Sequence, residues 1–127
     1  MMSKILVVDD EPELVKAIEI RLRASGYQVE VAYDGEEGIK KAMEFKPDLI
    51  ILDIVMPKIS GYEVCKILKS NEETRHIPIL ILTASQQREL EKECLALGAK
   101  IALMKPFETE ELLLLVKQLL KNQGGGS

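Results

Sequence analysis

Five short apolar runs, each followed by a longer segment with helical periodicity, constrain the fold of this chain more than any other feature. The runs cover residues 4–9, 28–33, 48–53, 79–82 and 100–104, and the helical segments cover about 12–26, 35–46, 61–70, 86–97 and 109–121. Parallel strands need crossover helices, and right-handed crossovers place those helices on both faces of a sheet. We therefore expect a doubly wound, flavodoxin-like α/β fold, with five parallel strands in the order 2-1-3-4-5.

Residue 28 begins a run that alternates, with Val29, Val31 and Tyr33 on one side, which predicts a less buried edge strand. Gly26 and Gly98 follow two of the helical segments. We expect both glycines to end those helices in the left-handed conformation.

The length of 127 residues suits one domain, which we expect to cover residues 1–122. Residues 123–127, Gln-Gly-Gly-Gly-Ser, have the composition of a flexible linker remnant or a cloning scar. A net charge of −4 argues against direct binding of nucleic acid or of an anionic membrane. No apolar stretch approaches the roughly 20 residues of a membrane span, and no signal peptide precedes the first strand, so we expect a cytoplasmic protein.

Two cysteines and one histidine are candidates for a disulfide or a zinc site. Cys65 and Cys94 each lie among apolar residues at helical spacing, so we expect small buried side chains and no disulfide framework. A zinc site needs about four ligands, which these residues do not supply. His76 lies in a polar connection and is expected to be an ordinary surface residue.

Polar side chains stand where four of the apolar runs end. Asp9 and Asp10 end the first run, Asp53 ends the third, Thr83 follows the fourth and Lys105 follows the fifth. The carboxyl ends of parallel strands lie at one edge of a sheet, where ligands bind in open α/β folds. Because strands one and three are neighbours in the expected order, their three carboxylates should converge.

Three clustered carboxylates repel one another, and at least one pKa should rise unless a cation is present. Mg²⁺ is the expected cation, because it binds one or two carboxylates and keeps several waters or phosphate oxygens. With Lys105 and Mg²⁺ the three acids form a neutral site, which can accept a phosphoryl dianion. The alternative is that these acids are ordinary helix caps and surface groups. Three acids, a hydroxyl and an amine, all at strand ends, make that alternative weak.

These residues also carry a resemblance. From about Lys4 to Lys121 the chain resembles the receiver domain of two-component response regulators, in the single-domain form of chemotaxis regulators. The motifs that match, in order and at the family's spacing, are Val7-Val8-Asp9-Asp10-Glu11, Asp48-Leu49-Ile50-Ile51-Leu52-Asp53, Met56-Pro57, Gly61, Thr83-Ala84, Gly98-Ala99 and Lys105-Pro106-Phe107.

The resemblance implies that Asp53 accepts a phosphoryl group from a phosphohistidine on a sensor histidine kinase or a phosphotransfer protein. It implies that Asp10, Asp53 and the backbone carbonyl of Val55 ligate Mg²⁺, and that Asp9 holds the ion through water. Thr83 and Lys105 would then bind the phosphoryl oxygens.

The resemblance further implies that Ala84 leaves room for the phosphoryl group and that the bond from Lys105 to Pro106 is cis. Such a domain is a signalling switch and not an enzyme, although it catalyses its own phosphorylation and its slow dephosphorylation. Val55 and Ser85 flank the expected pocket without an acid or amide to orient a water. We therefore predict a phosphoryl lifetime at the longer end for this family.

Two positions depart from the family pattern. Ala102 stands three residues before Lys105, where most receivers carry an aromatic residue, and Ser60 stands where an acid usually precedes Gly61. An alanine cannot report a movement of Thr83 by swinging a ring. Output should therefore use another surface or backbone shifts, and the departure favours an atypical or engineered receiver.

Two other functions remain to be weighed. The same fold can serve as a non-phosphorylated docking or dimerisation module, which would not need the five pocket residues. A flavin protein or small enzyme of flavodoxin-like fold would need a phosphate-binding loop after the first strand, where this chain has Asp10-Glu11-Pro12-Glu13. We expect the partners to be the phosphodonor and a downstream protein or missing output domain. The oligomeric state should be a monomer or a weak, phosphorylation-dependent dimer.

Overall fold

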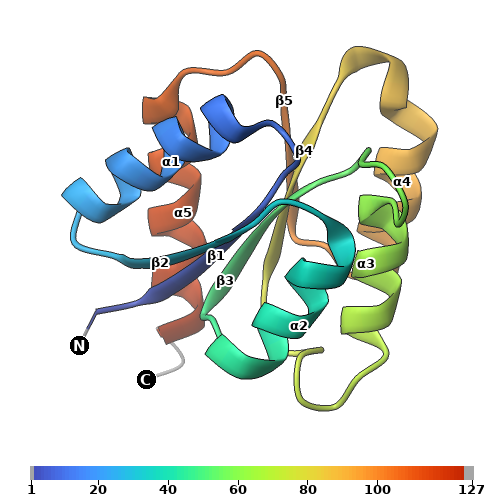
Figure 1. Ribbon diagram of the computed structural model, residues 1–127, viewed down its shortest axis with the longest axis horizontal. Coiled ribbons are helices and arrows are strands. Elements are labelled where there is room, and N and C mark those ends of the chain that lie inside the picture. The colour runs from blue at the N-terminus through green and yellow to red at the C-terminus, as the bar shows by residue number, and fades with distance from the viewer. Residues whose placement is uncertain (1, 125–127) are drawn as a thin grey trace.

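The computed structural model describes residues 2–124, with side chains through residue 121, and strands and helices alternate along it as predicted (Figure 1). The strands are β1 Lys4–Val8, β2 Gln28–Ala32, β3 Leu49–Asp53, β4 Ile79–Thr83 and β5 Ile101–Met104. The α-helices are α1 Pro12–Ala24, α2 Gly35–Phe45, α3 Gly61–Lys69, α4 Arg88–Leu97 and α5 Thr109–Gly124, and a 3-10 turn, η1 Ser85–Gln87, precedes α4. All strand pairs are parallel in the order β2-β1-β3-β4-β5, so the predicted topology is confirmed.

The sheet lies between two layers of helices, α1 and α5 on one face and α2, α3 and α4 on the other (Figure 1). Successive residues of the central strands point to opposite faces, so each strand feeds both layers. In β3, Ile50 and Leu52 pack in the cluster beneath α2, α3 and α4, whereas Leu49 and Ile51 pack in the cluster beneath α1 and α5. Apolar burial on both faces explains why β3 is an unbroken apolar run.

Local signals in the sequence fix the ends of the helices. Pro12 opens α1 at a position that needs no backbone N–H. Asp34 caps α2, where its side chain accepts a hydrogen bond from the Glu37 N–H at 2.8 Å. The Ser60 hydroxyl caps α3 in the same way and accepts from the Glu63 N–H at 3.2 Å. Ser60 therefore has a structural role as the N-cap of α3.

Gly26 and Gly98 follow α1 and α4 with φ of 94° and 119°, which confirms both predicted helix ends.

The β2 strand ends one residue earlier than predicted, at Ala32 instead of Tyr33. Val29 and Val31 lie on one side of the strand as predicted, in the cluster beneath α1 and α5, whereas Ala32 is buried in the cluster beneath α2, α3 and α4 and Tyr33 is exposed. The strand ends at Ala32, and the Tyr33 N–H donates to the Glu37 carboxylate at 2.8 Å. The chain has thus already turned toward α2, so Tyr33 does not continue the alternation. The position of β2 at the edge of the sheet is as predicted.

The remaining expectations concern isolated side chains. Cys65 and Cys94 are buried free thiols in the cluster beneath α2, α3 and α4, and burial raises the pKa of Cys94 to about 12. His76 is exposed, as predicted. Within the described part of the chain, no helix has the length and apolar character needed to cross a membrane. The expected tail over residues 123–127 lies largely outside the described residues.

Candidate functional site

The register of the sheet brings the predicted polar residues to one edge. Val8 pairs with Leu52, so Asp9 follows β1 at the level where Asp53 ends β3. On the other side of β3, Asp53 pairs with Leu82, and Thr83 ends β4 one residue later. Thr83 in turn pairs with Met104, which Lys105 follows. The parallel ladders therefore convert four distant sequence positions into one site.

The three acids converge as predicted. Asp9, Asp10 and Asp53 each offer a carboxylate oxygen, and these oxygens all lie within 4.8 Å of one another. Asp9 is fully buried and Asp53 is 7% exposed, whereas Asp10 is the most accessible of the three. A carboxylate oxygen of Asp9 also accepts the Glu11 backbone N–H at 2.9 Å, which fixes its orientation.

Burial and mutual repulsion change the protonation of this cluster. Burial, with a further contribution from the charge of Asp9, raises the pKa of Asp53 to about 6, while Lys105 acts in the opposite direction. Burial also raises the pKa of Asp9, although the Glu11 N–H and Lys105 oppose the shift. A cation bound beside these two carboxyl groups would oppose the shifts, because it favours their ionised forms.

Lys105 is the positive group of the site. Its ammonium nitrogen lies 3.1 Å from Asp9 Oδ2 and 3.5 Å from Asp53 Oδ1, and 2.7 Å from Glu11 Oε1. Burial favours the neutral amine, but the bond to Glu11 and the charges of Asp53 and Asp9 outweigh it and raise the pKa of Lys105. Lys105 therefore stays charged and ties the two buried acids to a third, more exposed one.

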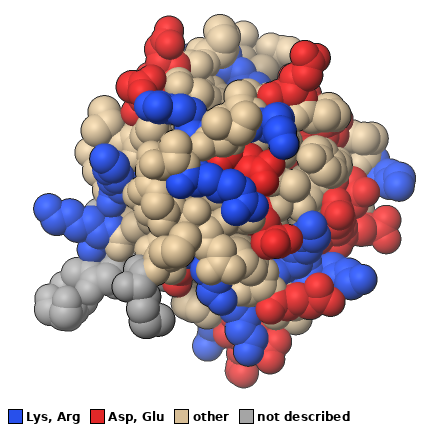
Figure 2. All heavy atoms as spheres, turned by 60° about the vertical axis from the view of Figure 1, so that its left-hand side comes forward, with Lys and Arg blue, Asp and Glu red and all other residues tan. Residues whose placement is uncertain are grey.

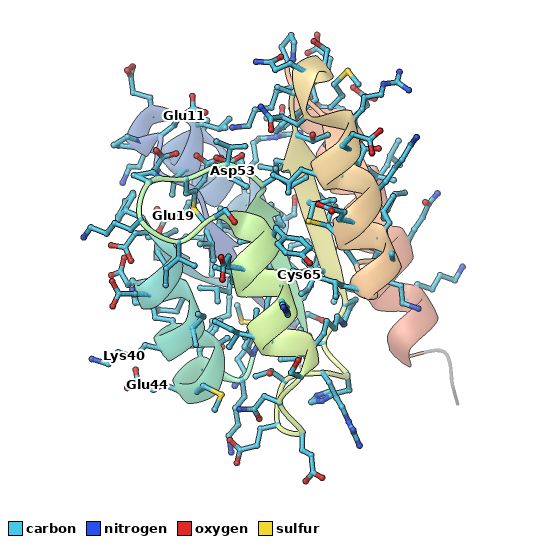
Figure 3. The ribbon with its side chains drawn as sticks, turned by 90° about the vertical axis from the view of Figure 1, so that its right-hand side faces the viewer. Glu11, Glu19, Lys40, Glu44, Asp53 and Cys65 are labelled. Carbon is cyan, nitrogen blue, oxygen red and sulfur yellow. The ribbon has the colours of Figure 1, made fainter. Side chains whose placement is uncertain are left out.

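Glu11 is a residue that the sequence analysis did not assign to the site. The predicted charge balance counted three acids against Lys105, whereas the structure places four carboxylates around it or beside it. Figure 3 shows Glu11 and Asp53 at the same end of the molecule, with Glu44 of α2 at the opposite end. The signal in the sequence was its place directly after Asp10, in the loop that leaves β1.

A pocket of about 220 Å³ opens at Asp53. The residues that line it are Glu11, Asp53, Ile54, Val55, Thr83, Ala84, Gln86, Gln87 and Lys105. Thr83, Ala84 and Val55 thus stand beside Asp53, as the resemblance implied. Ser85 is not a lining residue, and Gln86 and Gln87 were missed because the 3-10 turn that presents them was not predicted.

A second hollow of about 380 Å³ lies next to this pocket. It is lined by Leu14, Pro106 and Phe107 together with Glu11 and Lys105, which line the first pocket too. The Glu11–Lys105 ion pair therefore stands between the acidic pocket and a more apolar hollow. The Lys105–Pro106 peptide bond is cis, as predicted.

The donor set fits a magnesium ion. Mg²⁺ prefers carboxylate and other oxygen ligands and keeps several waters, and the cluster offers oxygens of Asp9, Asp10 and Asp53 on an accessible edge. The pKa of Asp53 is raised, and a nearby cation would favour the ionised form of this carboxyl group. The same pocket sets a hydroxyl and an ammonium beside Asp53, which suits an incoming anion.

Comparison with known proteins is consistent with this geometry. The protein family "Response regulator receiver domain" matches residues 5–117. The alkaline phosphatase synthesis transcriptional regulatory protein PhoP of Bacillus subtilis is 46% identical over 121 residues, which are 95% of this chain and 50% of that protein. The chain spans about half the length of the curated relatives it matches.

Two solved structures have the same architecture. The chemotaxis response regulator CheY4 of Vibrio cholerae has a TM-score of 0.87 and 36% identity, with 94% of this chain and 99% of that chain covered. The receiver domain of a sensor histidine kinase from Pseudomonas aeruginosa has a TM-score of 0.85 and 31% identity, with coverage of 94% and 98%. That structure holds a magnesium ion coordinated in its active site cleft.

Proposed function

This chain belongs to the response regulator receiver domain family, and from that premise we propose that it is a switch which accepts a phosphoryl group on Asp53. The observation that carries the proposal is the cluster itself. Asp53 ends the central strand, within 4.8 Å of two other carboxylate oxygens and 3.5 Å from the Lys105 ammonium. A docking module has no need for this buried and electrostatically unfavourable arrangement.

In the proposed reaction a carboxylate oxygen of Asp53 attacks the phosphorus of a phosphohistidine. An O–P bond forms, the N–P bond breaks, and the imidazole leaves with the electron pair of that bond. Asp53 must be ionised for this attack, and with a pKa of about 6 it is largely ionised at neutral pH. A Mg²⁺ ion bound by Asp10, Asp53 and the Val55 carbonyl, and by Asp9 through water, would supply neutralisation of the acids and of the phosphoryl oxygens.

The other pocket residues bind and align the transferred group. Lys105 and the Thr83 hydroxyl are placed beside Asp53 to contact the phosphoryl oxygens as negative charge spreads onto them. The side chain of Ala84 is a single methyl group, so it leaves room in the pocket for the phosphoryl group. Alignment and charge neutralisation are the main demands of phosphoryl transfer, so no further general base is required.

The wider role follows from the family. We propose that the phosphodonor is a sensor histidine kinase or a phosphotransfer protein in the cytoplasm, and that a downstream protein or an output domain reads the switch. Ala102 is partly buried in β5, so the signal leaves through backbone shifts or another surface and not through a ring at this position. Charges of both signs are interspersed on the face shown in Figure 2, which favours protein partners over nucleic acid.

The test is the intact mass of the protein after incubation with Mg²⁺ and phosphoramidate, a small phosphodonor. The wild type should gain one phosphoryl group, and Asp53→Asn should gain none because the amide is not a nucleophile for phosphorus. Glu44→Gln, which removes an exposed acid at the opposite end of the molecule, should be labelled like the wild type. An unlabelled wild type, or equal labelling of Asp53→Asn, would overturn the proposal in favour of a non-phosphorylated docking module.

The labelled protein also tests the predicted lifetime. Slow loss of the phosphoryl group over time is the expectation from Val55 and Ser85. The structure adds Gln86 and Gln87 to the pocket wall, and an amide there could align a water. Rapid loss from the wild type, slowed by Gln86→Ala or Gln87→Ala, would contradict the predicted lifetime and identify the reason.

A further inference from the structure

We propose that Glu11 is a positioning residue that holds Lys105 in the unphosphorylated protein and releases it when Asp53 is phosphorylated. The Glu11 carboxylate would thereby set how readily the site accepts a phosphoryl group. This inference rests on the proposed phosphorylation of Asp53 and assigns a role to a residue outside the five that the strand ends supply.

The ammonium of Lys105 is shared unequally among three acids. Its hydrogen bonds go to Glu11 at 2.7 Å and to Asp9 at 3.1 Å, whereas Asp53 lies at 3.5 Å. The nearest partner of Lys105 is thus not the acceptor but the glutamate. An ammonium has three N–H donors, so contacts with several phosphoryl oxygens require that at least one existing bond be given up.

Of the two hydrogen bonds, the one to Glu11 is easier to break. The Asp9 side chain is fully buried, and without Lys105 it would be left as a buried charge with fewer partners. The Glu11 side chain is 59% exposed, so water can replace Lys105 when the pair separates. Release of Lys105 toward the phosphoryl group therefore proceeds by loss of the Glu11 contact.

The backbone around Glu11 keeps its carboxylate in reach of Lys105. Glu11 is the N-cap residue of α1, yet its side chain makes no capping hydrogen bond to that helix. Its backbone N–H is fixed to Asp9 at 2.9 Å, so the loop between β1 and α1 is tied to the acidic cluster. Because Glu11 and Lys105 together separate the two hollows, separation of the pair also changes the wall of the hollow at Leu14 and Phe107.

The experiment compares initial rates of phosphorylation by phosphoramidate in Mg²⁺, again by intact mass. Glu11→Gln should be phosphorylated about two- to fivefold faster than the wild type, which is the range expected for loss of one exposed ion pair. The matched control is Glu13→Gln, which removes the same charge from an exposed residue two positions further along α1. It should have the wild-type rate. Equal acceleration of both variants would show a general charge effect and would overturn the inference, as would an unchanged or slower Glu11→Gln.

Two further measurements separate a role exerted through Lys105 from other causes. In a Lys105→Met background, addition of Glu11→Gln should have no effect on the rate, because the residue that Glu11 holds is gone. In the unphosphorylated proteins, acylation of Lys105 by an amine-reactive reagent, followed by peptide mass analysis, should be severalfold faster in Glu11→Gln than in the wild type or Glu13→Gln. The acylation does not depend on phosphorylation, so the two proposals can fail separately. A wild type that gains no phosphoryl group would overturn only the proposed phosphorylation of Asp53. Equal acylation of Lys105 in Glu11→Gln and the wild type would overturn the role of Glu11.

Discussion

The side chain of Asp53 is only 10% exposed and its carboxyl group lies against two other acids, so its negative charge is held under unfavourable conditions. Burial removes solvating water, and Asp9 and Asp10 add repulsion, which together raise its pKa to about 6. Lys105 relieves part of this repulsion but is shared with Asp9 and Glu11. The same features that place a nucleophile in a protected pocket therefore reduce the stability of the metal-free domain at neutral pH.

This leads to a prediction about pH. Between about pH 4 and 6 the folded protein holds a proton on Asp53 that the unfolded chain has lost, so the folded state gains stability as the pH falls through this range. The free energy of unfolding in EDTA should thus be about 1 kcal/mol higher at pH 5 than at pH 7, because one pKa unit corresponds to about 1.4 kcal/mol and only about one unit of the shift is titrated between these two pH values. Urea unfolding followed by circular dichroism at the two pH values measures this difference.

The controls for this prediction are one variant and one ion. Asp53→Asn should remove most of the difference, since its amide does not titrate. Addition of Mg²⁺ at pH 7 should raise the stability of the wild type, because a ligand that binds only the folded state stabilises it, and should raise that of Asp53→Asn less. Wild-type stability that is equal or lower at pH 5 would contradict the assigned origin of the raised pKa.

Which site residues could be predicted depends on where they stand in the chain. Asp9, Asp53, Thr83 and Lys105 sit at or directly after strand ends, and the parallel register ties those positions to one place in space. Gln87 lies in the short turn η1, whose course is set by packing and not by periodicity. The place of Gln87 in the pocket wall therefore depends on the coordinates, whereas Glu11 could have been assigned to the site from its place directly after Asp10.

At the scale of the elements, the close approach of α3 to the end of β3 fixes the acceptor. Gly61 begins α3, and a Cβ atom at this position would lie 2.1 Å from the Asp53 carbonyl oxygen and 2.6 Å from the Ile54 Cα. The Gly61 N–H also donates to the Ile54 carbonyl at 2.6 Å. The absence of a side chain is therefore what lets the loop return to the strand that carries the acceptor.

Gly61→Ala should consequently destabilise the domain by about 2–4 kcal/mol, because the neighbouring atoms are backbone and cannot move aside. It should also slow phosphorylation of Asp53, whose backbone must shift. The matched variant is Gly26→Ala, where a Cβ meets open space and only the positive φ is unfavourable, at about 1 kcal/mol. Melting curves and labelling rates of both variants check this; equal losses in the two would contradict a specific clash at Gly61.

The end of α2 offers a stabilising change. Lys46 caps this helix in the left-handed conformation with φ of 52°, which an L-residue with a side chain adopts unfavourably. Lys46→Gly should raise the free energy of unfolding by about 0.5–1 kcal/mol. Lys40→Gly, an exposed position inside the same helix, should lower it by about 1 kcal/mol. Urea unfolding of the two variants measures both effects, and a loss of stability in Lys46→Gly would refute the explanation.

The elements also show the limit of sequence patterns. The order of strands and helices could be predicted because apolar periodicity changes at each boundary, and both glycine-ended helices are as expected. The last residue of β2 could not be predicted, because Tyr33 leaves the strand for a reason that lies in α2: the bond from the Tyr33 N–H to the Glu37 carboxylate. Alternation over so few residues cannot record where a strand stops.

At the scale of the whole molecule, one sheet supplies both apolar clusters, so neither layer of helices has a core of its own. We therefore expect the 127-residue chain to unfold in one cooperative step. Far-ultraviolet circular dichroism and tyrosine fluorescence should give the same urea midpoint, since the tyrosines lie in different parts of the fold and the helices in both layers. Midpoints that differ would show that one layer melts separately.

The relatives that this chain matches are about twice its length. A domain whose two layers depend on one sheet can respond to phosphorylation only as a unit or at its loops. The residues that surround the acceptor, Glu11, Gln87 and Lys105, all lie on loops or turns that face outward from the sheet. Whatever reads the switch is therefore expected to contact this edge or the helices next to it.

The strand that bears the acceptor is bonded on both sides, and each of its five residues is buried. Strands in such a place exchange their amide hydrogens only when the entire domain opens. The acceptor strand is therefore not expected to unfold locally. When the protein is heated, its capacity to be phosphorylated on Asp53 should be lost together with the fold of the whole domain. Changes to the residues around Asp53, such as Lys105, are therefore expected to alter the rate of phosphorylation without unfolding the strand that carries the acceptor.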